Sequence, residues 1–248
     1  MKNKIASFGE IVWDCFGDSK TLGGAPLNFA YFCAKFGCDS AIISAVGNDG
    51  LGRAALAKIA EIRLDARAVA VLPDLPTGIV DVSEGSDGLP AYNIRRPAAW
   101  DEIGLSEAAA EIADGCGAFC FGTLAQRSET SRKTLFALLK TLKPSCLKVF
   151  DANLRQNYFD AKILAESLEY ADMLKLNDSE LPVVHGLLFR RKCAELREMA
   201  EEIAEKFSLK FLACTLGAEG HIVFSRGEEP ARGLPEPVSY THLTLPTT

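Results

Sequence analysis

The chain has 248 residues, 48% of them hydrophobic, and a formal net charge of -6, which suit a globular protein with a sizeable core and argue against binding to the nucleic-acid backbone. Its eight cysteines include no CxxC pair, so they indicate neither a zinc site nor a disulfide framework. The first apolar run, residues 5–8, is too short for a signal peptide and no stretch is long enough to span a membrane, so we expect a cytoplasmic protein without membrane partners.

The first third of the chain alternates strand-like and helix-like segments. Residues 5–8, 41–46 and 68–72 are short apolar runs typical of buried strands, and residues 26–36 and 51–62 between them have helical patterns. This order predicts βαβ units, which form a parallel sheet.

The run Leu22–Ala30 places two glycines, a proline and one amide at the start of the first predicted helix. Gly23 and Gly24 allow the backbone to approach a bound molecule closely, and Pro26 suits a first helical turn. Asn28 then offers hydrogen-bond donors and an acceptor. The run fits a ligand site, and it also fits an ordinary turn from a loop into a helix.

One segment departs from the alternation. Residues 77–83 and 91–95 are strand-like, and the Asp87-Gly88 pair between them is a hairpin signal. A hairpin fits poorly between crossover units of a parallel sheet, so we predict a β flap outside it, paired with residues 11–16. The lid predicted in this way comprises residues 11–17 and 77–97, and lids of this kind exclude water from a site.

The second half of the chain resumes the alternation. Strands are predicted at residues 118–121, 147–150, 173–176 and 211–215, and helices at 130–142, 163–170 and 193–207. The prediction is one α/β domain over residues 1–238, with helices on both faces of a doubly wound, mostly parallel sheet.

Polar residues follow the predicted strands at the sheet edge where ligands of such folds bind. Neither a GxGxxG nor a GxxxxGK[ST] fingerprint accompanies them, which disfavours a dinucleotide site and a P-loop. The polar residues are Asp14, Asn28 and the segments 47–49, 151–155, 175–180 and 215–220. We expect several of them to converge at one edge.

The order of four motifs resembles the ribokinase-like (PfkB-type) carbohydrate kinases. These motifs are Gly24–Asn28, Val46–Gly52, Asn177 with Glu180, and Thr215 with Gly217 and Gly220. Within that family the chain is most similar to fructokinases, through the segments 9–14, 99–101, 121–127 and 150–155.

The resemblance implies a three-layer α/β/α sandwich with a small β lid, and ATP-dependent transfer of a phosphoryl group to a primary hydroxyl of a monosaccharide, with fructose expected first. It implies sugar binding by Asp14, Gly23, Gly24, Asn28, Arg95, Asn153 and Arg155. It implies nucleotide binding by Lys175, Asn177, Glu180, Thr215, Gly217 and Gly220, with Glu180 contacting Mg²⁺ through water. ATP and Mg²⁺ are the expected cofactors, and the expected partners are small molecules.

Other interpretations of these residues remain open. Asn153 could cap the next helix, and Asn177 with Glu180 has the spacing of a capping box. Thr215 could belong to a plain hairpin turn, and Arg95 could be solvated. The substrate could be ribose, a nucleoside or a keto-deoxy sugar acid, and a non-catalytic sugar-binding protein is also compatible.

The family's Asp-Thr-x-Gly-Ala-Gly-Asp segment, whose last Asp is the catalytic base, does not occur in this sequence. We therefore assign no catalytic base and expect the polypeptide as written to lack kinase activity. Residues 239–248 fit nothing upstream and resemble translated adapter sequence, so we expect a truncated kinase with a non-native tail. Exposed lid edges suit a homodimer formed through the lids.

Overall fold

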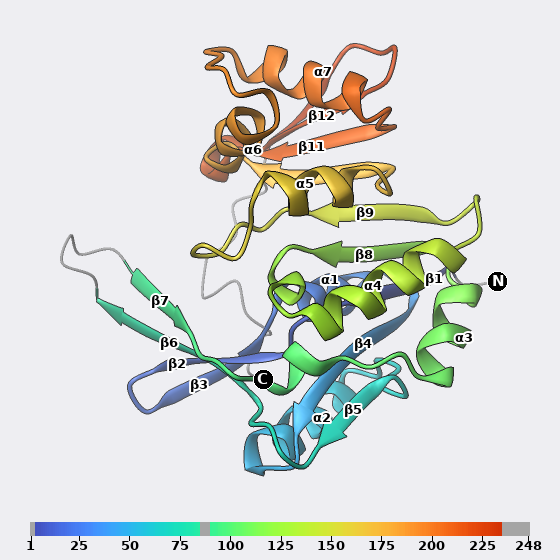
Figure 1. Ribbon diagram of the computed structural model, residues 1–248, viewed down its shortest axis with the longest axis vertical. Helices are drawn as coiled ribbons and strands as arrows, with labels where there is room; N and C mark the ends of the chain where they lie inside the picture. The colour runs from blue at the N-terminus through green and yellow to red at the C-terminus, as the bar shows by residue number, and fades with distance from the viewer. Residues whose placement is uncertain (1–2, 85–89, 235–248) are drawn as a thin grey trace.

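The computed structural model describes residues 3–84 and 90–234, and its largest feature is a twisted sheet (Figure 1). Within those residues the sheet has nine strands in the order β13, β12, β11, β10, β9, β8, β1, β4 and β5. Their bounds are β1 Lys4–Phe8, β4 Asp39–Gly47, β5 Val69–Leu72, β8 Ala118–Gly122, β9 Leu147–Asp151, β10 Met173–Asn177, β11 Phe211–Thr215, β12 His221–Ser225 and β13 Ala231–Gly233.

The strands from β5 across to β11 all run parallel, β12 pairs antiparallel with β11, and the edge strand β13 pairs antiparallel with β12. The carboxyl ends of β1, β4, β8, β9, β10 and β11 therefore meet along one edge. The mostly parallel, doubly wound sheet predicted from the sequence is confirmed.

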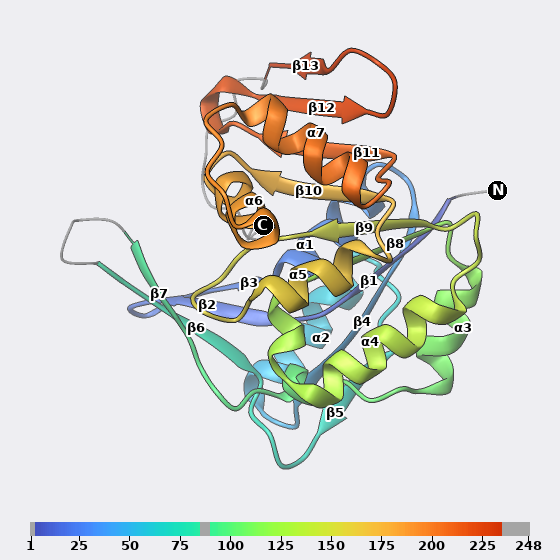
Figure 2. The ribbon, with the colours of Figure 1, turned by 45° about the horizontal axis from the view of Figure 1, so that its top comes forward.

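Helices cover both faces of this sheet, and the two views in Figures 1 and 2 agree on their arrangement. On one face lie α1 (Ala25–Lys35) and α2 (Gly50–Glu61), against β1, β4 and β8. On the other face lie α3 (Glu107–Gly115), α4 (Glu129–Thr141), α5 (Ala161–Leu168), α6 (Glu180–Phe189) and α7 (Leu196–Lys206). Short 3-10 helices occupy Ala99–Glu102, Leu124–Arg127 and Gly217–Glu219. No helix within the described ranges has the length and apolar character that crossing a bilayer requires.

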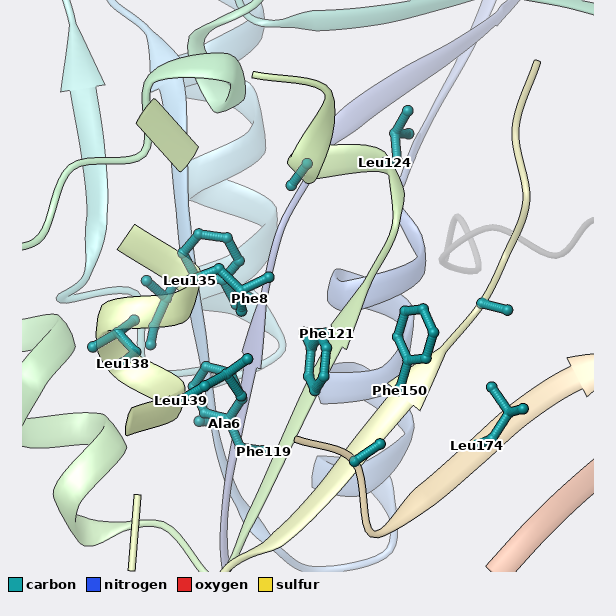
Figure 3. Close-up of a cluster of buried hydrophobic side chains, with 14 of the residues drawn as sticks. Ala6, Phe8, Phe119, Phe121, Leu124, Leu135, Leu138, Leu139, Phe150 and Leu174 are labelled. Atoms are coloured by element: carbon teal, nitrogen blue, oxygen red, sulfur yellow. The ribbon is translucent and has the colours of Figure 1, made fainter. Parts of the chain in front are cut away.

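The main hydrophobic core lies between the sheet and the helices α3 to α7. Phe121 and Phe150, on the neighbouring strands β8 and β9, stack with ring centroids 5.3 Å apart (Figure 3). Leu135 and Leu138 reach this layer from α4, and all four side chains are buried. Burying a side chain of this size stabilises the folded state by about 1.5–3 kcal/mol. These contacts fix the strands whose carboxyl ends meet along one edge of the sheet.

Four strands form a separate lid sheet that projects from the side of the main sheet (Figure 1). They are β2 (Val12–Phe16), β3 (Ser19–Gly23), β6 (Gly78–Glu84) and β7 (Pro90–Ile94), in the order β3, β2, β6, β7. The structure pairs β2 with β6 and β6 with β7, as the sequence predicted, and adds β3, which the sequence did not predict. The predicted turn at Asp87-Gly88 lies outside the described residues.

The start of β6 is tied to the loop between β4 and α2. The Asp49 carboxylate accepts hydrogen bonds from the Thr77 N–H at 2.8 Å and the Thr77 hydroxyl at 2.7 Å, and from the Gly52 N–H at 2.7 Å. A Cβ at Gly47 would lie 2.5 Å from the Leu75 carbonyl oxygen, and one at Gly52 would lie 2.0 Å from the Gly47 carbonyl oxygen. The glycines and the aspartate of this motif therefore hold the base of the lid against the main sheet.

Candidate functional site

The site is built from residues that follow the carboxyl ends of the parallel strands. Asn153 follows β9, the pair Asn177 and Glu180 follows β10, and Thr215 ends β11. The lid strand β2 carries Asp14 over the same edge, beyond β1. The predicted polar residues thus lie along one edge, where a ligand of an open α/β sheet binds.

The turn into α1 is shaped by its contact with the segment after β1. Gly24 has φ of 115°, and a Cβ there would lie 2.3 Å from the Glu10 carbonyl oxygen. The Ala25 N–H donates to Glu10 Oε1 at 3.2 Å. Gly24 is therefore a backbone position that only glycine fills without strain, and it caps α1 with Pro26 in the first turn, as the sequence predicted.

Asp14 and Asn28 flank this turn from the lid and from α1. Asp14 is half-buried on β2, opposite Thr21 of β3, and burial raises the pKa of its carboxyl while Arg155 acts in the opposite direction. Asn28 is also half-buried, and its backbone N–H donates to the Gly24 carbonyl at 2.9 Å. A carboxylate and an amide held on a fixed backbone are groups that can bind sugar hydroxyls.

The end of β9 contributes a half-buried carboxylate and an asparagine with a positive φ. Asp151 accepts a hydrogen bond from Lys175 Nζ on β10 at 3.0 Å, and burial raises the pKa of Asp151 while Lys175 lowers it. Asn153 has φ of 37°, a left-handed conformation that is uncommon for residues other than glycine. Asp151, Asn153 and Glu10 line one small pocket together with Pro26 and Thr123.

Asn177 and Glu180 form a reciprocal capping box at the start of α6. Asn177 Oδ1 accepts from the Glu180 N–H at 2.8 Å, and Glu180 Oε2 accepts from the Asn177 N–H at 2.9 Å. Glu180 Oε1 also accepts from the Leu154 N–H at 2.8 Å. The pair therefore caps a helix, and it also holds the loop that carries Asn153 and Arg155 against β10.

The turn after β11 is a tight loop that contains two left-handed glycines. Gly217 has φ of 55° and Gly220 has φ of 94°, and a Cβ at Gly220 would lie 2.0 Å from the Gly233 carbonyl oxygen. The Thr215 carbonyl accepts from the Asp178 N–H at 3.0 Å, so this turn is attached to the end of β10. It is the hairpin turn into β12, and its exposed backbone lies at the edge where the carboxyl ends of the parallel strands meet.

The structure places Arg95 differently from the other predicted residues. Its guanidinium forms two hydrogen bonds with Asp81, at 2.6 and 2.7 Å, and its side chain is 55% exposed on the lid. Arg155 is exposed on the loop after β9, and its charge acts on Glu10, Asp14 and Asp151. Of the two arginines, Arg155 is the one whose charge acts on these carboxyl groups.

Glu10 is the residue at this site that the sequence analysis did not select. It lies two residues after β1, and its side chain is buried, with only 4% of the residue exposed. Burial raises the pKa of its carboxyl to about 7, although the hydrogen bond from the Ala25 N–H favours the charged form. Its position in the sequence could have indicated it, because residues directly after a parallel strand lie at the edge of the sheet where ligands bind.

Comparison with known proteins places the chain in a family. The profile of the pfkB family carbohydrate kinases matches residues 2–239. The chain belongs to this family. The α/β fold with a small β sheet beside the main sheet, which the resemblance implied, is confirmed by the strand order and by the solved structures below.

Two pfkB relatives match over most of the chain. An uncharacterized sugar kinase of Pyrococcus horikoshii, PH1459, is 30% identical over 195 residues, which are 71% of this chain and 62% of that protein. A fructokinase of Klebsiella pneumoniae is 31% identical over 198 residues, 75% of this chain and 64% of that protein. The match thus spans less than two thirds of the length of either relative.

Solved structures show the same fold. The fructokinase from Xylella fastidiosa superposes with a TM-score of 0.81 at 20% identity, over 96% of this chain and 77% of that one. PH1459 in complex with ATP superposes with a TM-score of 0.75 at 24% identity, over 95% of this chain and 78% of that one.

Proposed function

We propose that this pfkB family chain belongs to an ATP-dependent sugar kinase that transfers the γ-phosphoryl group to a primary hydroxyl of a monosaccharide, with fructose as the substrate. The observation that carries the proposal is the order of groups along one sheet edge. Asp14, Gly24 and Asn28 lie at one end, Asn177, Glu180 and Thr215 lie at the other, and Asp151 and Asn153 lie between them.

The acceptor end is suited to a neutral polyol. The Asp14 carboxylate accepts hydrogen bonds from two hydroxyls, and the Asn28 amide both donates and accepts. The Gly23 and Gly24 backbone lets the sugar approach closely, and the lid above it keeps water from the reacting hydroxyl. The similarity to the Klebsiella protein favours fructose as the substrate, because that protein is a fructokinase.

The nucleotide end supplies few charges and several backbone groups, which suits a triphosphate that brings its own metal. Magnesium keeps most of its waters and is held by one or two carboxylates together with the phosphates. Within the described ranges, no cluster of three or more His, Cys, Asp or Glu side chains could hold a metal alone. Each Glu180 oxygen accepts one N–H and keeps a lone pair for a metal-bound water. Bound Mg²⁺ would neutralise charge on the phosphates, and Lys175, Gly217 and Gly220 would orient them.

A binding experiment separates the two ends. In calorimetry, Asp14→Ala is expected to weaken fructose binding at least tenfold and leave Mg-ATP binding unchanged, and Glu180→Gln is expected to weaken Mg-ATP binding more than fructose binding. Lys133→Ala, on an exposed face of α4, is the control. Absence of fructose binding in the unmodified chain would overturn the sugar assignment, and absence of Mg-ATP binding would overturn the nucleotide assignment.

Turnover requires a base, and no Asp-Thr-x-Gly-Ala-Gly-Asp segment occurs in the sequence. We therefore propose that the 248-residue polypeptide binds its ligands without phosphorylating the sugar at an enzymatic rate. A coupled assay of ADP release with fructose and Mg-ATP is expected to show no enzymatic turnover. A rate of roughly 1–100 per second, ordinary for kinases, would overturn this part of the proposal.

A second substrate class is favoured by one observation. The charge of Arg155 acts on the carboxyl groups of Glu10, Asp14 and Asp151, and its guanidinium donates to the Leu154 carbonyl at 3.2 Å. A guanidinium in this position suits an anionic acceptor such as a keto-deoxy sugar acid. Arg155→Ala should weaken binding of such an acid more than binding of fructose, and equal losses would count against it.

Homodimer formation through the lids is also proposed. The lid sheet ends in β3 and β7, which carry unpaired edges in the described part of the lid. Light scattering coupled to size exclusion measures the mass, and a monomer at all concentrations would contradict the proposal.

A further inference from the structure

A carboxyl group is buried beneath the turn that forms the acceptor end of the site. Glu10 Oε1 lies 3.2 Å from the Ala25 nitrogen, at the start of α1. The Glu10 carbonyl oxygen lies against Gly24, and a Cβ at Gly9 would lie 2.7 Å from Pro26 Cγ. The Gly9-Glu10 segment and the Gly24–Pro26 turn are therefore packed directly on one another.

The surroundings of Glu10 are unusual for a residue with a purely structural role. Its carboxyl lines the pocket that also contains Asp151 and Asn153. The ionisable groups that face it are Asp151 from β9, Arg155 from the following loop and Cys120 from β8, and Lys175 pairs with Asp151 behind them. A second carboxylate in the same pocket raises the free energy of the ionised form of Glu10. A protonated Glu10 would therefore accept the Ala25 N–H at a lower free-energy cost than an ionised one.

We propose that Glu10 is a positioning residue for the acceptor sugar, because its carboxyl holds the Ala25 N–H and thereby sets the turn that presents Gly23, Gly24 and Asn28. This role rests on the proposed function of that turn as the sugar site. A carboxylate accepts a stronger hydrogen bond than a carboxylic acid does, and it also interacts favourably with the N-terminus of α1. Opening of the turn admits water to Glu10 and relieves the burial of its charge, which outweighs this hydrogen bond. The turn is therefore held more firmly when Glu10 is protonated, and the sugar binds more tightly below neutral pH than above it.

The state of the turn can be measured without any ligand. Hydrogen exchange of the Ala25 amide, corrected for the intrinsic rate, is followed from pH 5.5 to 8.5 in the unmodified chain and in the Glu10→Gln variant. Protection is expected to fall about five- to tenfold from pH 5.5 to 8.5 in the unmodified chain and to stay flat in Glu10→Gln. Protection of the Ala25 amide that does not change with pH in the unmodified chain would overturn the proposal. This outcome does not depend on whether the Glu10→Gln variant folds.

The consequence for the sugar is measured by calorimetry with fructose over the same pH range. The dissociation constant is expected to rise about five- to tenfold from pH 5.5 to 8.5 in the unmodified chain and to be independent of pH in Glu10→Gln. Glu129→Gln, at an exposed site on α4, is the control and should follow the unmodified chain.

The outcomes of the two arms are distinguishable. If fructose binds Glu10→Gln and the unmodified chain equally at every pH, the positioning role is overturned while the sugar site stands. If fructose binds neither protein but Ala25 protection changes with pH as described, the proposed substrate fails while the control of the turn by Glu10 stands. Glu10→Asp, which keeps the charge but is one methylene shorter, is expected to lose the pH-dependent protection.

Discussion

Arg127 and Asp101 form a buried ion pair with two hydrogen bonds, from Nε to Oδ1 at 2.7 Å and from Nη2 to Oδ2 at 2.9 Å. The Arg127 guanidinium also lies 3.8 Å from the ring centroid of Trp100 and 4.9 Å from that of Tyr158. Its Nη2 donates to the Arg95 carbonyl at the end of the lid. One guanidinium therefore connects the lid to the loop that carries Asn153 and Arg155.

Loss of this pair should be costly because both side chains are shielded from water. Arg127 and Asp101 side chains are only 1% and 8% exposed, and removing one partner leaves the other charge buried. Asp101→Asn is expected to lower the free energy of unfolding by about 3–5 kcal/mol, measured by urea denaturation. Glu129→Ala removes the exposed Lys133 pair and should cost less than about 0.5 kcal/mol. Equal effects of the two substitutions would contradict the role of burial.

The hydrogen bonds of Asp49 predict a loss of stability that depends on pH. Burial raises the pKa of Asp49, but hydrogen bonds from Thr77 and Gly52 outweigh it and lower the pKa below the ordinary 3.8. The ionised group therefore stabilises the fold above pH 3.8, and this stabilisation is lost as the pH falls through the lower folded-state value. Asp49→Ala should cost about 2 kcal/mol at pH 7 and less at pH 3, measured by urea denaturation.

The exposed Asp74 provides a comparison for Asp49. Asp74→Ala should change the free energy of unfolding by less than about 0.5 kcal/mol at either pH. If the cost of Asp49→Ala were the same at pH 3 as at pH 7, its carboxylate would not be the stabilising species.

The alternation of apolar runs was sufficient to predict the parallel strands of the main sheet, since most of them are largely buried and the exposed edge strand β5 is still an apolar run. The strand β3 was not predictable from its own residues, because Ser19–Gly23 contains Lys and Gly and forms a strand only by pairing with β2. The extent of α6 was also missed, because Glu180–Phe189 is apolar on most sides and contains Pro182, so it has no 3.6-residue stripe.

At the site, sequence patterns identified positions better than roles. Asn177 and Glu180 were found from their spacing, but only the structure shows that both carboxylate oxygens of Glu180 hold backbone N–H groups from two loops. The Val46–Gly52 motif holds the base of the lid, a role that depends on its contact with Thr77 far along the chain. Glu10 was missed because burial and the contact with Ala25 arise only after folding.

The turn at Gly24 predicts that a single methyl group will damage the acceptor end. Gly24→Ala places a Cβ 2.3 Å from the Glu10 carbonyl oxygen at φ of 115°, so the turn must move. Loss of about 2 kcal/mol of stability is expected, together with loss of measurable fructose binding. Gly50→Ala, in open space at the first residue of α2, is the control and should be neutral or stabilising by up to about 1 kcal/mol. Full fructose affinity in Gly24→Ala would contradict the assigned close approach.

The burial of Glu10 predicts a stability profile with a definite sign. Its pKa is about 7 in the folded chain and near the ordinary 4.5 when unfolded, so the folded state holds a proton that unfolding releases between these values. Stability must therefore decrease as pH rises from 4.5 to about 7, by up to about 3 kcal/mol from this group. Glu10→Gln keeps an oxygen for the Ala25 N–H and has no charge to bury, so its free energy of unfolding should exceed that of the unmodified chain above pH 7. Urea denaturation at pH 5, 6, 7 and 8 gives the free energy of unfolding of both proteins. Taking the difference between them cancels the contribution of the other carboxyl groups. Parallel curves would mean that Glu10 titrates as a solvated carboxyl, and the burial assigned to it would be wrong.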